Sequence, residues 1–244
     1  MTPPTGRTVR HLVRDDAGQV AATAADLILE ALDGESAIGL ATGSSPLGAY
    51  EEIVRRVRAR AVPTPVARCG YLLDEYLGLP TGDPNSYASV IRREVADAVG
   101  LDVRGPDGRA ADPAAEAQRY ERELAGASIA VQVLGIGRNG HLGFNEPGSA
   151  LDSTTRVVRL TETTRRDNAR FFDSSEQVPT HAITQGLATI MRARRLVLIA
   201  LGERKADAVR AALHGTVDPQ WPASILQRHP DAYVVTDRAA AAVR

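Results

Sequence analysis

Short apolar runs alternate with longer segments of helical periodicity along the whole chain. The apolar runs are nearly continuous, which is typical of strands that are buried on both faces of a parallel sheet. They cover residues 8–13, 37–41, 69–74, 131–136, 195–201 and 232–236. Helices are expected over residues 17–32, 46–60, 84–99, 113–125, 162–171, 181–192 and 203–213. This alternation predicts an α/β fold in which residues 1–244 form one domain, a mostly parallel, doubly wound, Rossmann-like sheet with helices on both faces.

Two of the expected helices have recognisable start signals. Ser45 before Pro46, and Asp112 before Pro113, each place a capping side chain before a proline in the first turn. In open parallel sheets, ligands bind at the carboxyl ends of the strands, in the loops that lead to the next helix. Catalytic and binding residues are therefore expected in four loops that follow strands. These loops are ATGSSP (41–46), DEYLG (74–78), GRNGHLGFNEPG (137–148) and GERK (202–205).

The loop ATGSSP combines a glycine, two serine hydroxyls and a helix N-terminus. Free N–H groups, the helix dipole and hydroxyls together favour an anion, phosphate above all. The loop is not a Walker A motif, because no Gly-Lys-Ser/Thr follows. A plain serine cap on a strand–helix turn explains the same residues equally well.

Asp74 and Glu75 follow the third apolar run. A carboxylate in a partly apolar pocket has a raised pKa and can act as a general base. The alternative is an acid that caps the helix expected at 84–99. We favour the functional interpretation because of the position at the ligand-bearing edge.

The stretch GIGRNGHLGFNEPG is rich in glycine and contains Asn139, His141, Asn145 and Glu146. A histidine exchanges protons near neutral pH, and a neighbouring carboxylate orients it and raises its basicity. The cluster offers few of the three or four ligands that a zinc site requires, so we expect no metal. The match to G-x-G-x-x-G does not predict a dinucleotide site, because no ribose-binding acid follows about 20 residues later.

Lys205 is the only lysine among the 29 Lys and Arg residues, and it follows the apolar run 195–201. A chain with this arginine bias is expected to use arginine at an ordinary surface position, and lysine is a compact cation that fits a tight phosphate pocket. Arg170, beside two phenylalanines in DNARFFD, is either an anion clamp or a partner of a helix C-terminus.

Composition excludes several classes of function. A net charge of −1 and 4% aromatic residues disfavour a nucleic-acid partner. One cysteine, Cys69, fits a reducing compartment, and no apolar run approaches the length of a membrane span. The first residues carry no secretory signal, so we expect a cytoplasmic protein.

The loops together resemble the glucosamine-6-phosphate deaminase family over nearly the whole chain. The signatures are LATGSSP, LDEYLGL with DPNSY after it, GIGRNGHLGFNEPGS, TRRDNARFFD, HAITQGLATI and LGERKA. The resemblance implies an enzyme that converts glucosamine 6-phosphate and water into fructose 6-phosphate and ammonia, without an organic cofactor. Its implied site has four catalytic positions and a phosphate cradle. The catalytic positions are Asp74 as enolisation base, His141 as the ring-opening group, Glu146 as its carboxylate partner, and Asn139, which is Asp in many members. The cradle is Thr42, Gly43, Ser44, Ser45, Arg170 and Lys205.

Two departures bear on regulation. Arg156 and Ser149 match parts of the activator site of hexameric members, but Val158 stands where a second basic residue is expected, and the chain stops at Arg244. We expect no allosteric activation, and either a monomer or a homo-oligomer. Three alternatives remain: a 6-phosphogluconolactonase-like hydrolase, a galactosamine-6-phosphate deaminase, and a non-catalytic sugar-phosphate sensor.

Overall fold

The large sheet of the computed structural model, which describes residues 9–62, 64 and 66–242, has seven strands. Every pair of neighbours in this sheet is parallel. In spatial order the strands are β1 (Arg10–Arg14), β10 (Ala232–Asp237), β9 (Arg195–Ala200), β6 (Ile129–Leu134), β2 (Ala37–Leu40), β3 (Cys69–Leu72) and β5 (Asp102–Arg104). The parallel sheet expected from the apolar runs is confirmed. Thr8, the first residue of the expected strand 8–13, lies outside the described residues.

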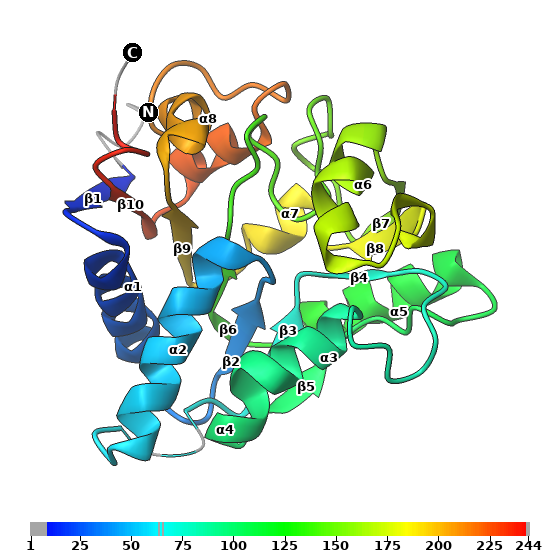
Figure 1. The fold of residues 1–244 in the computed structure, drawn as a ribbon, viewed down its shortest axis with the longest axis horizontal. Helices are drawn as coiled ribbons and strands as arrows, with labels where there is room; N and C mark the ends of the chain where they lie inside the picture. Colours follow the sequence, from blue (N-terminus) through cyan, green and yellow to red (C-terminus); the bar gives the residue numbers. More distant parts are fainter. Residues whose placement is uncertain (1–8, 63, 65, 243–244) are drawn as a thin grey trace, which may run out of the picture.

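Helices cover both faces of this sheet (Figure 1). One face carries α1 (Ala17–Ala31), α2 (Ser44–Arg58), α3 (Tyr87–Ile91), the π-helical turn η1 (Arg92–Ala96) and α4 (Asp97–Val99). The other face carries α5 (Pro113–Ala125), α7 (Leu187–Ile190), α8 (Ala206–Leu213) and the 3-10 segment η5 (Pro222–Arg228). Side chains alternate between the two layers along each strand: Val131 and Val133 pack towards α1 and α2, whereas Leu134 packs towards α7 and α8.

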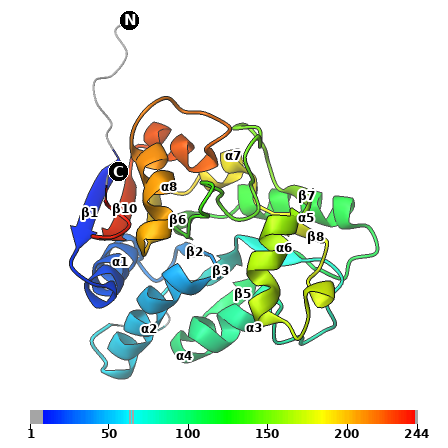
Figure 2. The ribbon, with the colours of Figure 1, turned by 45° about the horizontal axis from the view of Figure 1, so that its top comes forward.

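A second, antiparallel sheet of three strands stands beside the carboxyl end of β3. Its order is β4 (Asp74–Tyr76), β8 (His181–Thr184), β7 (Arg156–Arg159). The helix α6 (Glu162–Asn168) and the 3-10 turns η2 (Ala169–Phe171) and η3 (Ser175–Gln177) follow β7, and α6 lies next to the small sheet in both views (Figures 1 and 2). The chain passes from one sheet to the other at Leu73, whose N–H still donates to Leu40 O (2.8 Å).

The expected helix 181–192 is wrong in its first half. Residues 181–184 form β8, the central strand of the small sheet, with β4 on one side and β7 on the other. The apolar positions of this segment fit a buried strand as well as a helix, and pairing on both sides decides between them. Only the short helix α7 remains, after Gly186.

Helix starts differ from expectation in two places. α2 begins at Ser44 with Gly43 as its N-cap, so Ser45 is not the cap and Pro46 lies in the third helical position. The helix expected from residue 84 begins at Tyr87, where Ser86 accepts a hydrogen bond from Ser89 N. The other start is confirmed: Asp112 caps α5, and Pro113 is its first residue.

None of the helices in the described residues combines the length and the apolar character that crossing a membrane requires.

Candidate active site

The four loops that the sequence singled out converge at the carboxyl ends of β2, β3, β6 and β9. Gly135, just before the third loop, packs against Pro46 of the first loop: a Cβ built on this glycine would be 3.7 Å from Pro46 Cδ. Gly143 of the third loop packs against Asp74 of the second loop: a Cβ built on this glycine would be 3.1 Å from Asp74 Oδ2. Lys205 Nζ donates to the carbonyl oxygen of Ile136 (2.6 Å), which adds the fourth loop. Parallel strands bring their carboxyl ends to one edge, so the sheet itself assembles the site.

The first loop presents the start of α2 to this edge. Gly43 has a φ of 109°, a conformation that side chains other than glycine rarely adopt, and it turns the chain sharply from Thr42 into the helix. Ser44 and Ser45 form the first helical positions, and the N-cap Gly43 provides no side-chain capping bond. The free N–H groups and the positive end of this 15-residue helix suit an anion.

Lys205 closes the opposite side of the loop cluster. It ends the 3-10 turn η4 (Glu203–Lys205) and directly precedes α8. Asp237 accepts two hydrogen bonds from Gly202 N, at 3.1 and 3.0 Å, and so anchors the turn. The pKa of Lys205 is lowered, first by burial and then by the positive charge of Arg138. A bound anion would stabilise the charge of this partly buried ammonium, which lies near Arg138.

Arg170 is the third cation near this edge. Its guanidinium stacks on the ring of Phe171, 4.6 Å from the centroid, in η2. Phe171 is 52% exposed, so this stack lies at the surface. The charge of Arg170 reaches Lys205, whose pKa it helps to lower, while Asp167 acts in the opposite direction. Arg170 is therefore near enough to Lys205 for its charge to act on it.

Asp74 and Glu75 are both buried, yet they have different surroundings. Glu75 accepts hydrogen bonds from the N–H groups of Tyr76, Tyr87 and Ala88, each at 2.9 Å, and so caps α3. Burial raises the pKa of Asp74 well above its usual range, and the charge of Glu75 raises it further. Glu75 is therefore the helix cap, and Asp74 is a buried carboxyl with a raised pKa that remains the candidate base.

His141 and Glu146 meet across the glycine-rich loop. His141 Nδ1 lies 3.5 Å from Glu146 Oε2, and Asn139 Nδ2 donates to the same oxygen at 2.8 Å. Gly137 lies directly beneath the imidazole, because a Cβ there would be 2.4 Å from its ring atoms. Burial alone would raise the pKa of Glu146, but its contacts to His141, Thr164 and Asn139 lower that pKa to about 2. The carboxylate is therefore ionised and available to orient the histidine.

Two side chains at the site were missed by sequence reasoning. Thr164 donates to Glu146 Oε1, and Thr184 Oγ1 accepts a hydrogen bond from Phe144 N at 3.2 Å beside Gly143. Thr164 begins the stretch TRRDNARFFD and Thr184 lies in HAITQGLATI, so both belonged to noted signatures. Hydroxyls carry no charge pattern along a sequence, and only the fold shows what they contact.

Arg156 and Ser149, the two residues considered for an activator site, lie together. Arg156 donates to Asn145 Oδ1 at 2.9 Å and to Ser149 Oγ at 3.4 Å. Burial lowers the pKa of this half-buried guanidinium. Arg156 thereby supports Asn145 of the glycine-rich loop.

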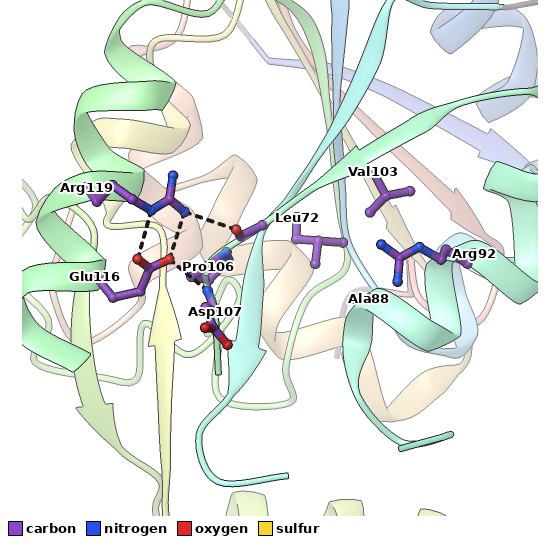
Figure 3. Close-up of a pocket in the computed structure, with 9 residues that line it drawn as sticks. Leu72, Ala88, Arg92, Val103, Pro106, Asp107, Glu116 and Arg119 are labelled. Atoms are coloured by element: carbon purple, nitrogen blue, oxygen red, sulfur yellow. Dashed lines mark hydrogen bonds and ion pairs between the residues drawn. The ribbon is translucent and has the colours of Figure 1, made fainter. Parts of the chain in front are cut away.

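A separate surface cavity of about 420 Å³ lies at the β5 edge of the large sheet, between α3 and α5 (Figure 3). Arg119 is held there by Glu116 and by Gly105 O, and Arg92 faces the cavity from the other side. None of the ten predicted site residues lines this cavity. In the part of the chain that the structure describes, no cluster of three or more His, Cys, Asp and Glu could hold a metal ion.

Comparisons with known proteins identify the family of this chain. The sequence model of the family described as glucosamine-6-phosphate isomerases/6-phosphogluconolactonase matches residues 8–235. A glucosamine-6-phosphate deaminase of Rhodococcus opacus (strain B4) is 52% identical over 235 residues, which cover 94% of this chain and 90% of that protein. A glucosamine-6-phosphate deaminase of Streptomyces coelicolor (strain ATCC BAA-471 / A3(2) / M145) is 54% identical over 212 residues, 85% of this chain and 81% of that protein.

Solved structures give the same grouping. A monomeric glucosamine-6-phosphate deaminase superposes with a TM-score of 0.91 at 36% identity, covering 97% of this chain and 100% of that one. A 6-phosphogluconolactonase from Trypanosoma cruzi has a TM-score of 0.74 at 18% identity, with 97% of each chain covered, and shares the fold. The chain belongs to the family of glucosamine-6-phosphate isomerases and 6-phosphogluconolactonases.

Proposed function

We propose that this protein is a glucosamine-6-phosphate deaminase that converts D-glucosamine 6-phosphate and water into D-fructose 6-phosphate and ammonia, in amino-sugar catabolism. The observation that carries the proposal is a buried carboxyl, Asp74, against the glycine-rich loop that holds the His141–Glu146 pair and that is bonded by Lys205. Relatives at about half sequence identity, named as glucosamine-6-phosphate deaminases, support it.

Asp74 is proposed as the base of the isomerisation. Its carboxylate removes the proton from C2 of the open-chain aldose and returns it to C1. The imine that results at C2 is hydrolysed by water, which leaves the ketone of fructose 6-phosphate and releases ammonia. A base with a raised pKa suits this task, because it takes and returns a proton near neutral pH.

His141 is proposed to open the pyranose ring by passing a proton from the C1 hydroxyl to the ring oxygen. Glu146 orients the imidazole and stabilises its protonated form, and Asn139 holds Glu146. Since Asn139 is uncharged, Glu146 alone supplies the negative partner.

The phosphate is proposed to bind between the start of α2 and the cations. Thr42, Gly43, Ser44 and Ser45 supply N–H groups and hydroxyls, while Lys205 and Arg170 supply charge. We propose further that residues 1–244 act as one unit in the cytoplasm, as a monomer or homo-oligomer. We propose no cofactor, metal, nucleic acid or membrane as a partner.

The proposal is tested by comparing ammonia release from glucosamine 6-phosphate with hydrolysis of 6-phosphogluconolactone. Consumption of the lactone alone would favour the hydrolase alternative, and binding of fructose 6-phosphate without turnover would favour a sensor. Glucosamine and galactosamine 6-phosphates differ only at C4, so kcat/KM on both identifies the preferred epimer. We also propose that activation by N-acetylglucosamine 6-phosphate is absent; sigmoidal kinetics that become hyperbolic with this compound would refute that.

A further inference from the structure

The two oxygens of the Glu146 carboxylate face different partners. Oε2 faces the glycine-rich loop, where it meets Asn139 Nδ2 at 2.8 Å and His141 Nδ1 at 3.5 Å. Oε1 faces α6, where it accepts a hydrogen bond from the Thr164 hydroxyl. The orientation of this carboxylate is therefore determined from two sides.

The direction of the Thr164 hydrogen bond is set by its acceptor. The ionised Glu146 carboxylate can only accept, so the single hydroxyl proton of Thr164 points to Oε1. Thr161 Oγ1 lies 3.0 Å from Thr164 Oγ1 and accepts a hydrogen bond from Thr164 N at 3.1 Å. Thr161 Oγ1 is also 3.5 Å from Glu146 Oε1, a much longer contact than that of Thr164. Thr164 is 8% exposed, so water competes little for that proton.

The helix that carries Thr164 is fastened at two further points. Asp167 pairs with Arg138 of the glycine-rich loop at 2.8 Å, and Asn168 Nδ2 donates to the Tyr76 hydroxyl of β4 at 2.8 Å. These contacts hold α6 independently of residue 164. Removal of one hydroxyl is therefore expected to leave the helix in place.

We propose that Thr164 is a positioning residue for the His141–Glu146 pair: its hydroxyl holds the Glu146 carboxylate so that Oε2 stays directed at the imidazole. The inference rests on the proposed function, and it concerns a residue that acts through Glu146. The terminal torsion of a glutamate is broad, so a carboxylate that loses its close donor on Oε1 and keeps only the 3.5 Å contact of Thr161 there can rotate. Rotation matters in this chain because Asn139 carries no charge and Glu146 is the one anion of the relay.

The experiment compares four proteins: wild type, Thr164→Val, Thr164→Ser and Thr163→Val. Valine replaces the hydroxyl by a methyl of similar size, and serine restores the hydroxyl. Thr163 is the exposed neighbour in the same helix, so Thr163→Val controls for the effect of valine on α6. Each protein is assayed for ammonia release from glucosamine 6-phosphate, and its affinity for glucitol 6-phosphate, an open-chain ligand, is measured by calorimetry.

We expect Thr164→Val to lose about tenfold in kcat, with KM and the glucitol 6-phosphate affinity within about twofold of wild type. Thr164→Ser and Thr163→Val are expected to stay close to wild type. A wild-type kcat in Thr164→Val would overturn the inference, as would an equal loss in Thr164→Ser or a loss confined to ligand affinity. If the wild type itself releases no ammonia, the proposed function fails and the inference with it.

Discussion

Asp74 and Glu75 are consecutive buried carboxyl residues, and only Glu75 is held by backbone N–H groups. Three such groups satisfy Glu75 and tie β4 to the start of α3, while Asp74 lies against Gly143 with a raised pKa. Burial raises the pKa of Glu75 too, but the three N–H groups oppose that rise and favour its charged form. One short stretch thus supplies both a structural acid, Glu75, and the proposed base, Asp74.

Glu75→Gln should shift the pH dependence of the reaction. Asp74 must be ionised to act as a base, so activity falls as pH drops through its raised pKa. Removing the neighbouring charge lowers that pKa, and the acidic limb of kcat/KM is expected to move to lower pH. Glu51→Gln, an exposed change on α2, is the matched control. An unmoved or upward-shifted limb in Glu75→Gln would contradict the account.

Asp74→Asn should abolish deamination while binding of the phosphorylated ligand survives. Retained turnover would remove Asp74 as the base. Isothermal calorimetry with glucitol 6-phosphate separates loss of chemistry from loss of binding.

The same variant should be more stable than wild type at neutral pH. A carboxyl whose pKa is raised on folding contributes fully to stability below its unfolded pKa of about 3.9, and this contribution is lost as pH rises through the folded pKa. Asparagine does not titrate. The stability advantage of Asp74→Asn over wild type should therefore be present at pH 7 and shrink as pH falls towards about 4. Each kcal/mol raises the unfolding midpoint by about 2–4 °C for a chain of this size. Equal unfolding midpoints of wild type and Asp74→Asn at pH 7 would show that burial does not raise the pKa of Asp74.

Lys205→Ala should raise KM for the phosphorylated sugar by about 10–100-fold, as expected for a hydrogen bond to a charged group. Arg204→Ala removes one positive charge from the adjacent exposed position and is the control. Lys205→Arg tests whether size matters: we expect it also to raise KM, because a planar guanidinium does not fit where the ammonium reaches Ile136 O. If arginine serves as well as lysine, the retention of this single lysine has no structural cause.

His141→Gln should lower kcat by about 10²–10⁴-fold, the usual contribution of a general acid–base group. The loss should be confined to reactions that begin with a closed ring. An equal loss with an open-chain substrate analogue would contradict the ring-opening role of His141.

Much of the fold could be predicted because apolar runs and helical periodicity reflect burial directly. The same reasoning located the site, since the loops after parallel strands must meet at one edge, as Lys205 on Ile136 and Gly143 beside Asp74 show. The small sheet was missed because its strands are short and residues 181–184 read as part of a helix. Tertiary pairing on both sides of that segment outweighed the local pattern.

The hydrogen bonds that particular side chains form were the least predictable feature. The sequence put Asp74 and Glu75 side by side without telling which one caps α3, because the capped helix starts at Tyr87, 12 residues after Glu75. Thr164 and Glu146 are 18 residues apart, and no spacing rule links a loop carboxylate to a hydroxyl on a later helix. Only the packing of α6 against the glycine-rich loop brings these two together.

The central claim is tested most directly by measuring both products from glucosamine 6-phosphate in one assay with wild type and Asp74→Asn. The account predicts that wild type forms fructose 6-phosphate and ammonia in equal amounts, and that Asp74→Asn forms neither while still binding glucitol 6-phosphate. Absence of ammonia with the wild type, or undiminished product formation by Asp74→Asn, would contradict it.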